Sequence, residues 1–186
     1  ARYCCSPIND FMLYLGQLIN HATQLSPFVM GVVVSVVVGC ALTLPISSVA
    51  LCVMLNIDGL AAGAATVGCC AQMVGFAVIS YSDNGVGGLI SQGLGTSMLQ
   101  IGNIARKPII WLAPTLTSAI LGPVSTLWLG MTNNALGAGM GTAGLVGVFG
   151  VIEASQGIMS SAQLWTAIIL LMFILPALIA GVVAYV

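Results

Sequence analysis

The stretch NGVGGLISQGLGTSMLQIGNIARKP, residues 84–108, decides how the rest of this chain can fold. It holds five glycines before Thr96 and continues with Ser97, Gln100 and Asn103. Such a segment is too polar and too flexible for a lipid-facing helix, yet long apolar segments flank it on both sides. Irregular backbone survives at membrane depth only where it is buried in protein or lines an aqueous cavity. The stretch is therefore predicted to be a re-entrant loop and a site for a solute.

The composition places the chain in a membrane. Of its 186 residues, 59% are hydrophobic and only 4% are charged, whereas about a quarter of the residues of a soluble domain are charged. The net charge of −1 provides no basic face for a phosphate backbone, which argues against nucleic-acid binding. The lipid bilayer is therefore the first expected partner.

Four apolar segments without charged residues are long enough to span a bilayer, which takes roughly 17–25 residues. They cover residues 28–44, 60–81, 109–131 and 164–186. We expect an all-α, polytopic membrane protein with about four to six transmembrane helices and two Gly-rich re-entrant segments. Because the chain starts at Ala1 and stops inside an apolar run, we also expect one domain over 1–186 that is part of a longer chain.

Residues 8–25 are predicted to form an amphipathic helix, because apolar residues recur there every three or four positions and polar residues fall on the opposite face. Such a helix lies on the membrane surface or lines a polar cavity. His21, on the polar face, is the only histidine of the chain. It either binds a solute hydroxyl or moves a proton, or it is simply one hydrated residue of a polar stripe.

Prolines and turn residues divide the apolar segments. Pro45 follows the first span directly and is predicted to kink or break the helix. Asp58 and Gly59 form a turn signal ahead of the second span. Pro114 and Pro123 lie within the third span and favour a bent or discontinuous helix, of the kind that transporters place around their sites.

The second span carries a stripe of small residues that lets helix backbones approach closely. Gln72 stands beside this stripe at mid-membrane depth. Its amide either bonds a neighbouring helix or binds the solute, and the sequence does not decide between the two. The small residues of the stripe are Ala61, Ala64, Gly68, Ala71 and Gly75.

A second Gly-rich segment, residues 132–158, lies between the third and fourth spans and contains GAGMGTAGLVGVFG. Two interrupted segments of this kind indicate a central binding site in a transporter, so this segment is also predicted to be re-entrant. It ends near Glu153, the only acidic residue in this half. At membrane depth, Glu153 would be a hydroxyl acceptor or proton carrier; alternatively it lies at the surface.

Several other functions find no support. The glycines of 84–108 resemble a phosphate-binding loop, but no lysine follows them directly, so nucleotide binding is rejected. The six cysteines lack CxxC spacing and are expected to be small packing residues, with no metal and no cofactor. No nucleophile and base pair is evident, so catalysis by this chain is not expected. Arg106 and Lys107 place their end of the third span in the cytoplasm.

Five ordered motifs extend over most of the chain: LTLPISSVAL (42–51), GLAAGAATVGCCAQMVGF (59–76), GGLISQGLGTSMLQIGNI (87–104), PTLTSAILGPVST (114–126) and GAGMGTAGLVG (137–147). Together they resemble the second EIIC family of the bacterial phosphotransferase system, the family that includes the perfringolysin regulatory protein. The resemblance implies the C-terminal half of an EIIC-like domain, with a helical fold and re-entrant hairpins, as a multi-pass protein of the bacterial inner membrane. It also implies a homodimer, phosphotransferase-system subunits as partners, and a carbohydrate or similar small polar solute.

Together these observations predict an EIIC-type permease that translocates its solute by alternating access. Whether transport is coupled to sugar phosphorylation by partner subunits stays open. Two alternatives also stay open: a membrane-bound sensor or regulator with a permease fold, and an incomplete permease half that needs a second chain. The predicted substrate-binding residues offer neutral hydrogen bonds, apart from the carboxylate and the imidazole: Gln72, Thr96, Ser97, Gln100, Asn103, Glu153 and His21.

Overall fold

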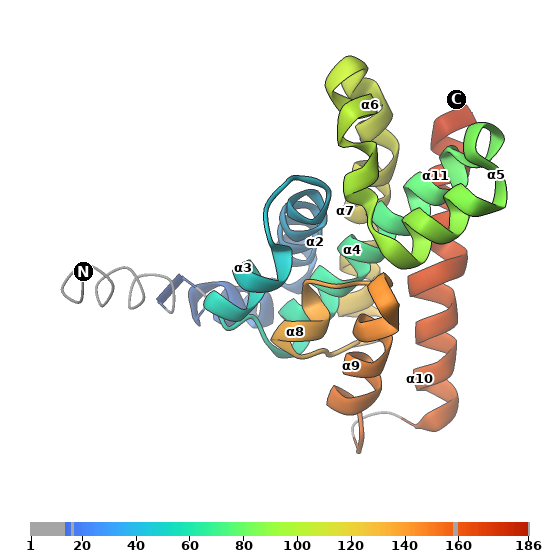
Figure 1. Ribbon diagram of the computed structural model, residues 1–186. Helices are drawn as coiled ribbons and strands as arrows, with labels where there is room; N and C mark the ends of the chain where they lie inside the picture. Colours follow the sequence, from blue (N-terminus) through green and yellow to red (C-terminus); the bar gives the residue numbers. More distant parts are fainter. Residues whose placement is uncertain (1–13, 16, 158–159, 186) are drawn as a thin grey trace.

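The structure is a computed structural model that describes residues 14–15, 17–157 and 160–185. Within these ranges it has ten α-helices, α2 to α11, joined by short 3-10 and π segments, η1 to η5 (Figure 1). The β-structure of the described residues is limited to one isolated bridge, between Gly59 and Asn133. The all-α prediction is confirmed.

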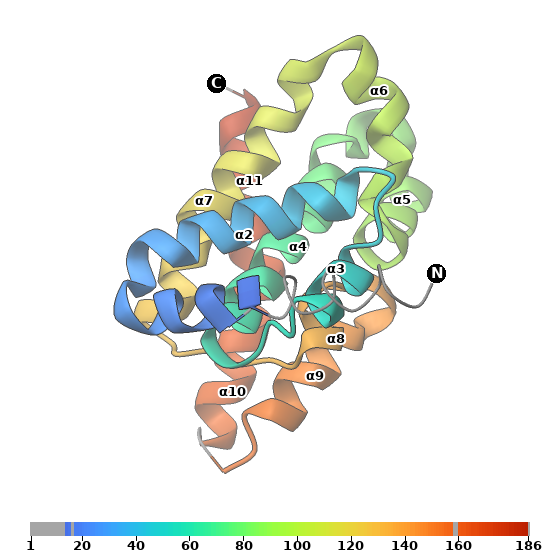
Figure 2. The ribbon, with the colours of Figure 1, turned by 90° about the vertical axis from the view of Figure 1, so that its left-hand side faces the viewer.

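One helix, α4 (Gly59–Ile79), forms the centre of the molecule and is buried along most of its length. It packs against α2 (Pro27–Thr43), α7 (Leu112–Leu127) and α11 (Leu175–Tyr185). Figure 2 shows α2 crossing in front of α4. The stripe of small residues makes this packing possible, because a Cβ at Gly68 would overlap the backbone of Ser35 on α2.

Three helices of the described residues are long and apolar enough to cross a membrane. They cover Gly59–Ile79, Pro108–Leu127 and Ser161–Tyr185, close to three of the predicted spans. The second contains η3 (Pro108–Trp111) before α7, and the third runs through α10 (Ser161–Ala167), η5 (Ile168–Ile174) and α11. The remaining predicted span corresponds to α2, a shorter apolar helix of 17 residues.

The prolines act in two ways. As predicted, the chain breaks at Pro45, between the end of α2 and the start of α3 (Ser48–Met54). The third span was predicted to be bent or discontinuous, and it continues through Pro123 as one α-helix, so the discontinuous alternative does not occur. Pro114 lies in the first turn of α7, where a missing N–H costs little. Near Pro123, the hydroxyl of Thr126 bonds the carbonyls of Gly122 and Pro123 in its own helix.

The first Gly-rich segment is mostly helical, although an irregular loop was expected. It comprises α5 (Tyr81–Ile90), η1 (Ser91–Gly95), η2 (Ser97–Gln100) and α6 (Ile101–Arg106). Local helices satisfy most backbone groups here, and the bend within α5 lies at Gly85, whose φ of +58° favours glycine. The segment is therefore a pair of helical arms joined by a tip.

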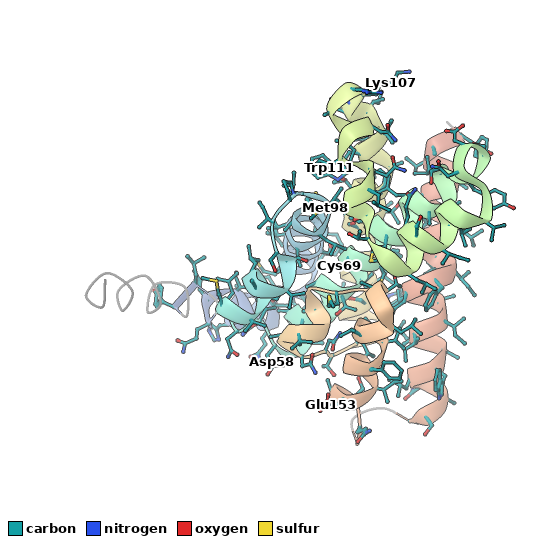
Figure 3. All side chains as sticks on the ribbon, viewed as in Figure 1. Asp58, Cys69, Met98, Lys107, Trp111 and Glu153 are labelled. Atoms are coloured by element: carbon teal, nitrogen blue, oxygen red, sulfur yellow. The ribbon has the colours of Figure 1, made fainter. Side chains whose placement is uncertain are left out.

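The second Gly-rich segment contains α8 (Ala135–Ala138), η4 (Ala143–Leu145) and α9 (Val146–Ala154). Figure 1 shows α6 and α9 at opposite ends of the molecule, so the two Gly-rich segments approach α4 from opposite ends. Figure 3 shows Lys107 at the α6 end of the molecule and Asp58 and Glu153 toward the other end, while Asp83 lies in the first turn of α5.

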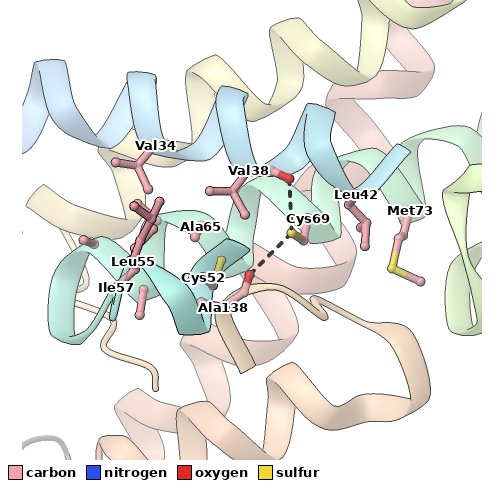
Figure 4. Close-up of a cluster of buried hydrophobic side chains, with 13 residues drawn as sticks. Val34, Val38, Leu42, Cys52, Leu55, Ile57, Ala65, Cys69, Met73 and Ala138 are labelled. Carbon is pink, nitrogen blue, oxygen red and sulfur yellow. Dashed lines mark hydrogen bonds between the residues drawn. The ribbon is translucent and has the colours of Figure 1, made fainter. Parts of the chain in front are cut away.

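An apolar cluster joins α2, α3 and α4, and two cysteines belong to it (Figure 4). Cys52 and Cys69 are fully buried, and the Sγ of Cys69 donates to the carbonyl of Ala138 at 3.4 Å. All four described cysteines are free thiols, in agreement with the packing role expected for them. The other two cysteines of the chain lie outside the described residues.

The described part of the predicted amphipathic helix, residues 14–15 and 17–25, is helical. Its remaining residues, 8–13 and 16, lie outside the described ranges. Asn20 fixes this helix to the turn before α4, because its Nδ2 donates to the Asn56 carbonyl at 2.8 Å and its Oδ1 accepts from the Asp58 N–H at 3.2 Å. His21 is exposed.

Candidate functional site

A polar cavity of about 370 Å³ lies between the two arms of the first Gly-rich segment. Gly87 and Gly88 provide room for it, since neither has a side chain. A Cβ at Gly88 would collide with the Asn84 side chain, whereas one at Gly87 would meet nothing within 4 Å. The lining has one apolar side chain and five neutral polar ones; the full set is Asn84, Gly87, Gly88, Ser91, Gln92, Leu99, Gln100 and Asn103.

Two of the predicted site residues, Gln100 and Asn103, line this cavity from one arm. They lie three positions apart, and the Nδ2 of Asn103 donates to the Oε1 of Gln100 at 2.7 Å. The bond uses one end of each amide. The Nε2 of Gln100 and the Oδ1 of Asn103 have no bond to a described residue, so this pair can offer one donor group and one acceptor.

Gln92 lines the cavity from the other arm, and the sequence analysis did not single it out. Its side chain is only 3% exposed, and its Oε1 is buried without a hydrogen-bond partner in the described residues. It lies within the π segment η1, and such segments are frequent at functional sites. The sequence signal that could have identified Gln92 is a single amide side chain close after the apolar residues Leu89 and Ile90.

Gln72 lies in a separate, closed network that joins α4 to its neighbours. Its Oε1 accepts from the Trp111 Nε1 at 3.1 Å and from the Thr43 hydroxyl at 3.3 Å. Its Nε2 donates to the Thr115 hydroxyl at 3.3 Å and lies 4.0 Å from the Sγ of Cys40. Both ends of the amide are engaged, so in this conformation Gln72 links helices.

Ser97 and Thr96 lie at the tip of the first Gly-rich segment. The Ser97 hydroxyl is 3.1 Å from that of Thr43, so Ser97 extends the Gln72 network into the tip. Thr96 accepts from the Met98 N–H at 3.2 Å and caps η2. Neither residue lines the polar cavity.

The two Gly-rich segments meet at Thr142. Its buried hydroxyl donates to the carbonyl of Gly93 at 2.6 Å and is 3.5 Å from the Sδ of Met73. Because the chain becomes extended at Thr96, the Gly93 carbonyl belongs to the last turn of a helix and needs an outside donor. Thr142 supplies this donor from 49 residues away, and the sequence analysis did not identify it.

Asn133 anchors the second segment beside α4. Its Nδ2 donates to the Thr66 hydroxyl at 2.6 Å and to the Gly147 carbonyl at 3.2 Å. A Cβ at Gly137 or Gly150 would crowd its amide. The glycines of this segment therefore make room for a buried polar anchor.

The two remaining predicted site residues, Glu153 and His21, lie apart from the polar cavity. Glu153 is exposed, and its Oε2 accepts from the Nδ2 of Asn134 at 3.3 Å. It lines a different cavity of about 360 Å³, together with Asp58 and Thr132. The described residues hold no cluster of three or more His, Cys, Asp or Glu side chains that could bind a metal ion.

The chemistry of the polar cavity is therefore neutral hydrogen bonding. Its lining holds amides and a hydroxyl and has no charged side chain. Such groups suit hydroxyl-bearing solutes, because every unpaired buried donor or acceptor costs about 1–3 kcal/mol. A charged solute would find no counter-charge in this lining.

The comparisons with known proteins gave one match. The family model described as "Phosphotransferase system, EIIC" matches residues 2–186. No curated protein matches the chain, and no solved structure matches it.

Proposed function

We propose that this chain, which belongs to the phosphotransferase-system EIIC family, translocates a carbohydrate or similar small polar solute by alternating access. Membership of the family makes it a membrane transporter component, from the translocating part of the system and not from a catalytic subunit. The class of solute, the alternating-access mechanism and the solute-binding residues are proposals, and they rest on the geometry of the polar cavity and of the two Gly-rich segments.

The observation that carries the proposal is the neutral polar cavity between the arms of the first Gly-rich segment. Gln100 and Asn103 line it with a free donor and a free acceptor, and the lining has no charge. Adjacent hydroxyl groups of a sugar can accept from the first amide and donate to the second. These two residues are proposed to bind the solute directly.

Gln72, Thr96 and Ser97 are proposed to support this site and not to contact the solute. Gln72 and Ser97 share one hydrogen-bonded network with Thr43, and Thr96 caps the turn at the tip. Glu153 and His21, which lie apart from the cavity, are proposed to have no direct contact with the solute.

We propose that the two Gly-rich segments, residues 84–108 and 132–158, are re-entrant hairpins, and their arrangement supports alternating access. They approach α4 from opposite ends and touch at Thr142 and Gly93 (Figure 1). In this proposal the contact closes the cavity on one side of the membrane, and its separation opens it. Half-helices that meet near the centre of a bundle are a common basis of transport sites.

We assign four spans, taking α2 as the fourth, together with the amphipathic helix near the N-terminus. The 17 residues of α2 give a length of about 25 Å, which a locally thinned bilayer accommodates. Arg106 and Lys107 lie at one end of the molecule, which the positive-inside rule assigns to the cytoplasm of a bacterial inner membrane. A homodimer, phosphotransferase-system subunits as partners, and coupling to solute phosphorylation belong to the same proposal.

The test is a thermal-shift screen of the purified protein against sugars and polyols, followed by uptake into proteoliposomes. A solute at about a hundred times its dissociation constant should stabilise the fold by roughly 2.7 kcal/mol. Gln100→Ala and Asn103→Ala should lose this stabilisation, while the exposed control Gln24→Ala should keep it. Stabilisation without uptake would instead favour a sensor with a permease fold. No stabilisation by any solute would contradict the proposal.

A further inference from the structure

Among the described residues that line the cavity, Gln92 carries the one side-chain polar atom that is both buried and without a hydrogen-bond partner. Its side chain is 3% exposed, and its Oε1 has no partner in the described residues. The other amides whose bonds are described, those of Gln100 and Asn103, are bonded to each other. A buried acceptor without a donor is a free-energy cost that a suitable ligand removes on binding.

The position of Gln92 is held firmly by its neighbours. Within η1, the Thr96 N–H donates to the Ser91 carbonyl at 2.9 Å, which closes the π turn around Gln92. The next residue, Gly93, is held by the Thr142 hydroxyl at 2.6 Å. The backbone that presents Gln92 is therefore fixed from both Gly-rich segments, while the terminal torsion of a glutamine side chain rotates with little restriction.

The rest of the lining limits which ligand can satisfy this amide. The hydroxyl of Ser91 already donates its hydrogen to the Gly88 carbonyl at 3.2 Å, so it cannot also donate to Gln92. The lining holds no cation and no carboxylate. The lining also carries the amide nitrogens of Asn84 and Gln100, but neither is within hydrogen-bond distance of the Gln92 Oε1 in this structure. The missing donor is therefore taken to be a neutral group of the solute, or water.

We propose that Gln92 is a specificity-determining residue of the cavity. In this proposal, rotation of its terminal torsion turns the buried Oε1 toward the cavity, where it selects neutral solutes that donate a hydroxyl hydrogen to it. A solute that lacks this hydroxyl leaves the acceptor unpaired and binds more weakly. The inference rests on the proposed transport function, because it takes the same cavity as the solute site. It adds the hydrogen-bond role of Gln92, which family membership does not specify.

The experiment compares each hydroxyl of a solute with the Gln92 amide in a double-mutant cycle. D-glucose, D-mannose, D-galactose and D-mannitol are the probes, each with its monodeoxy analogues, and binding is measured by calorimetry on the detergent-purified chain. The variants are Gln92→Met, which keeps the length and removes the amide, and Gln92→Glu, which keeps an acceptor. The matched control is Gln24→Met, the same change at an exposed position.

For wild type, one monodeoxy analogue of the bound probe should bind about five- to 150-fold more weakly than its parent. In Gln92→Met the parent should weaken by a similar factor, and the difference between parent and analogue should disappear. Gln24→Met should match wild type. Gln92→Glu should still distinguish the analogue from its parent, which shows that the acceptor matters and not the fold alone.

Two results separate the failure of this inference from that of the proposed function. If wild type binds a probe and Gln92→Met keeps the same preference for the parent over every analogue, the role of Gln92 is overturned while the transport site stands. If wild type binds none of the probes, the proposed function falls and this inference falls with it.

Discussion

Thr142 joins the two Gly-rich segments through one hydroxyl, and removing that hydroxyl should destabilise the fold measurably. In Thr142→Val the methyl group that replaces the hydroxyl fills nearly the same space, so the change removes a hydrogen bond without leaving a cavity. The bond is short, 2.6 Å to the Gly93 carbonyl, and Thr142 is fully buried. An acceptor left unpaired in a protein interior costs about 1–3 kcal/mol, and hydrogen bonds between membrane helices cost about 0.6–1.7 kcal/mol when broken. We therefore expect a loss of about 1–2 kcal/mol in the free energy of unfolding.

The assay is reversible unfolding in mixed micelles, with sodium dodecyl sulfate as denaturant, and thermal unfolding as a second readout. A loss of this size should lower Tm by roughly 2–4 °C for each kcal/mol in a chain of this length. Thr166→Val is the matched control, because the exposed Thr166 hydroxyl bonds only carbonyls of its own helix, Ala162 at 3.0 Å and Gln163 at 2.8 Å. Thr142→Ser should recover most of the loss, since it restores the hydroxyl.

Two results would refute this reasoning. Thr142→Val would be as stable as Thr166→Val if the bond to Gly93 contributed nothing. Thr142→Ser would be as unstable as Thr142→Val if the methyl group, and not the hydroxyl, held the segments together.

Three further predictions concern packing and buried polarity. Gly68→Ala should destabilise the fold by about 1–3 kcal/mol, because its Cβ meets the Ser35 backbone. Gly87→Ala lies in α5 with open space around it, so it should be neutral or stabilise the fold by up to about 1 kcal/mol in the same unfolding assay; an equal loss of stability in both variants would contradict the role of close packing at Gly68. Gln72→Leu should lower the free energy of unfolding by about 1–3 kcal/mol, because it removes the hydrogen-bond partner of Trp111, Thr43 and Thr115. The loss of the bond to Trp111 should also shift tryptophan fluorescence. An unchanged spectrum and an unchanged stability would show that the Gln72 network is dispensable. Burial raises the pKa of the Cys52 thiol to about 12. Between the ordinary thiol pKa and this value, the thiol of the unfolded chain is ionised while that of the folded chain stays neutral. The free energy of unfolding should therefore fall as the pH rises through this range. Replacing Cys52 with Ala should flatten this dependence in pH-dependent unfolding, and an unchanged slope would argue against the assignment.

The sequence predicted the features that depend on local composition. The apolar runs locate the spans of α4, α7 and α11, because length and hydrophobicity are sufficient for that inference. Pro45 marks the break after α2, since its ring cannot continue a helix. The small residues of α4, Gly68 above all, indicated the close packing that the structure shows.

The features that the sequence did not predict depend on contacts between distant residues. The bond between Thr142 and Gly93 joins positions 49 residues apart, and no periodicity encodes it. The Oε1 of Gln92 is buried and has no partner in the described residues, a property that arises only once the arms are folded together. Glu153 was a reasonable candidate as an acidic residue beside a Gly-rich run, but the end of α9 places it at the surface.

The helical character of the first Gly-rich segment was missed for a different reason. Glycine weakens an isolated helix by about 1 kcal/mol per residue relative to alanine, so five glycines indicated irregular backbone. Packing against α4 outweighs that preference, and the π segment η1 bridges the point where the helical pattern would otherwise break.

The most direct test of the account is an experimental structure of the protein with the solute that stabilises it best in the thermal-shift screen. The account predicts that the solute lies between the two arms of the first Gly-rich segment, with hydroxyl groups within hydrogen-bond distance of Gln100 and Asn103. A solute found in the cavity beside Asp58 and Glu153, at the opposite end of the molecule, would contradict it.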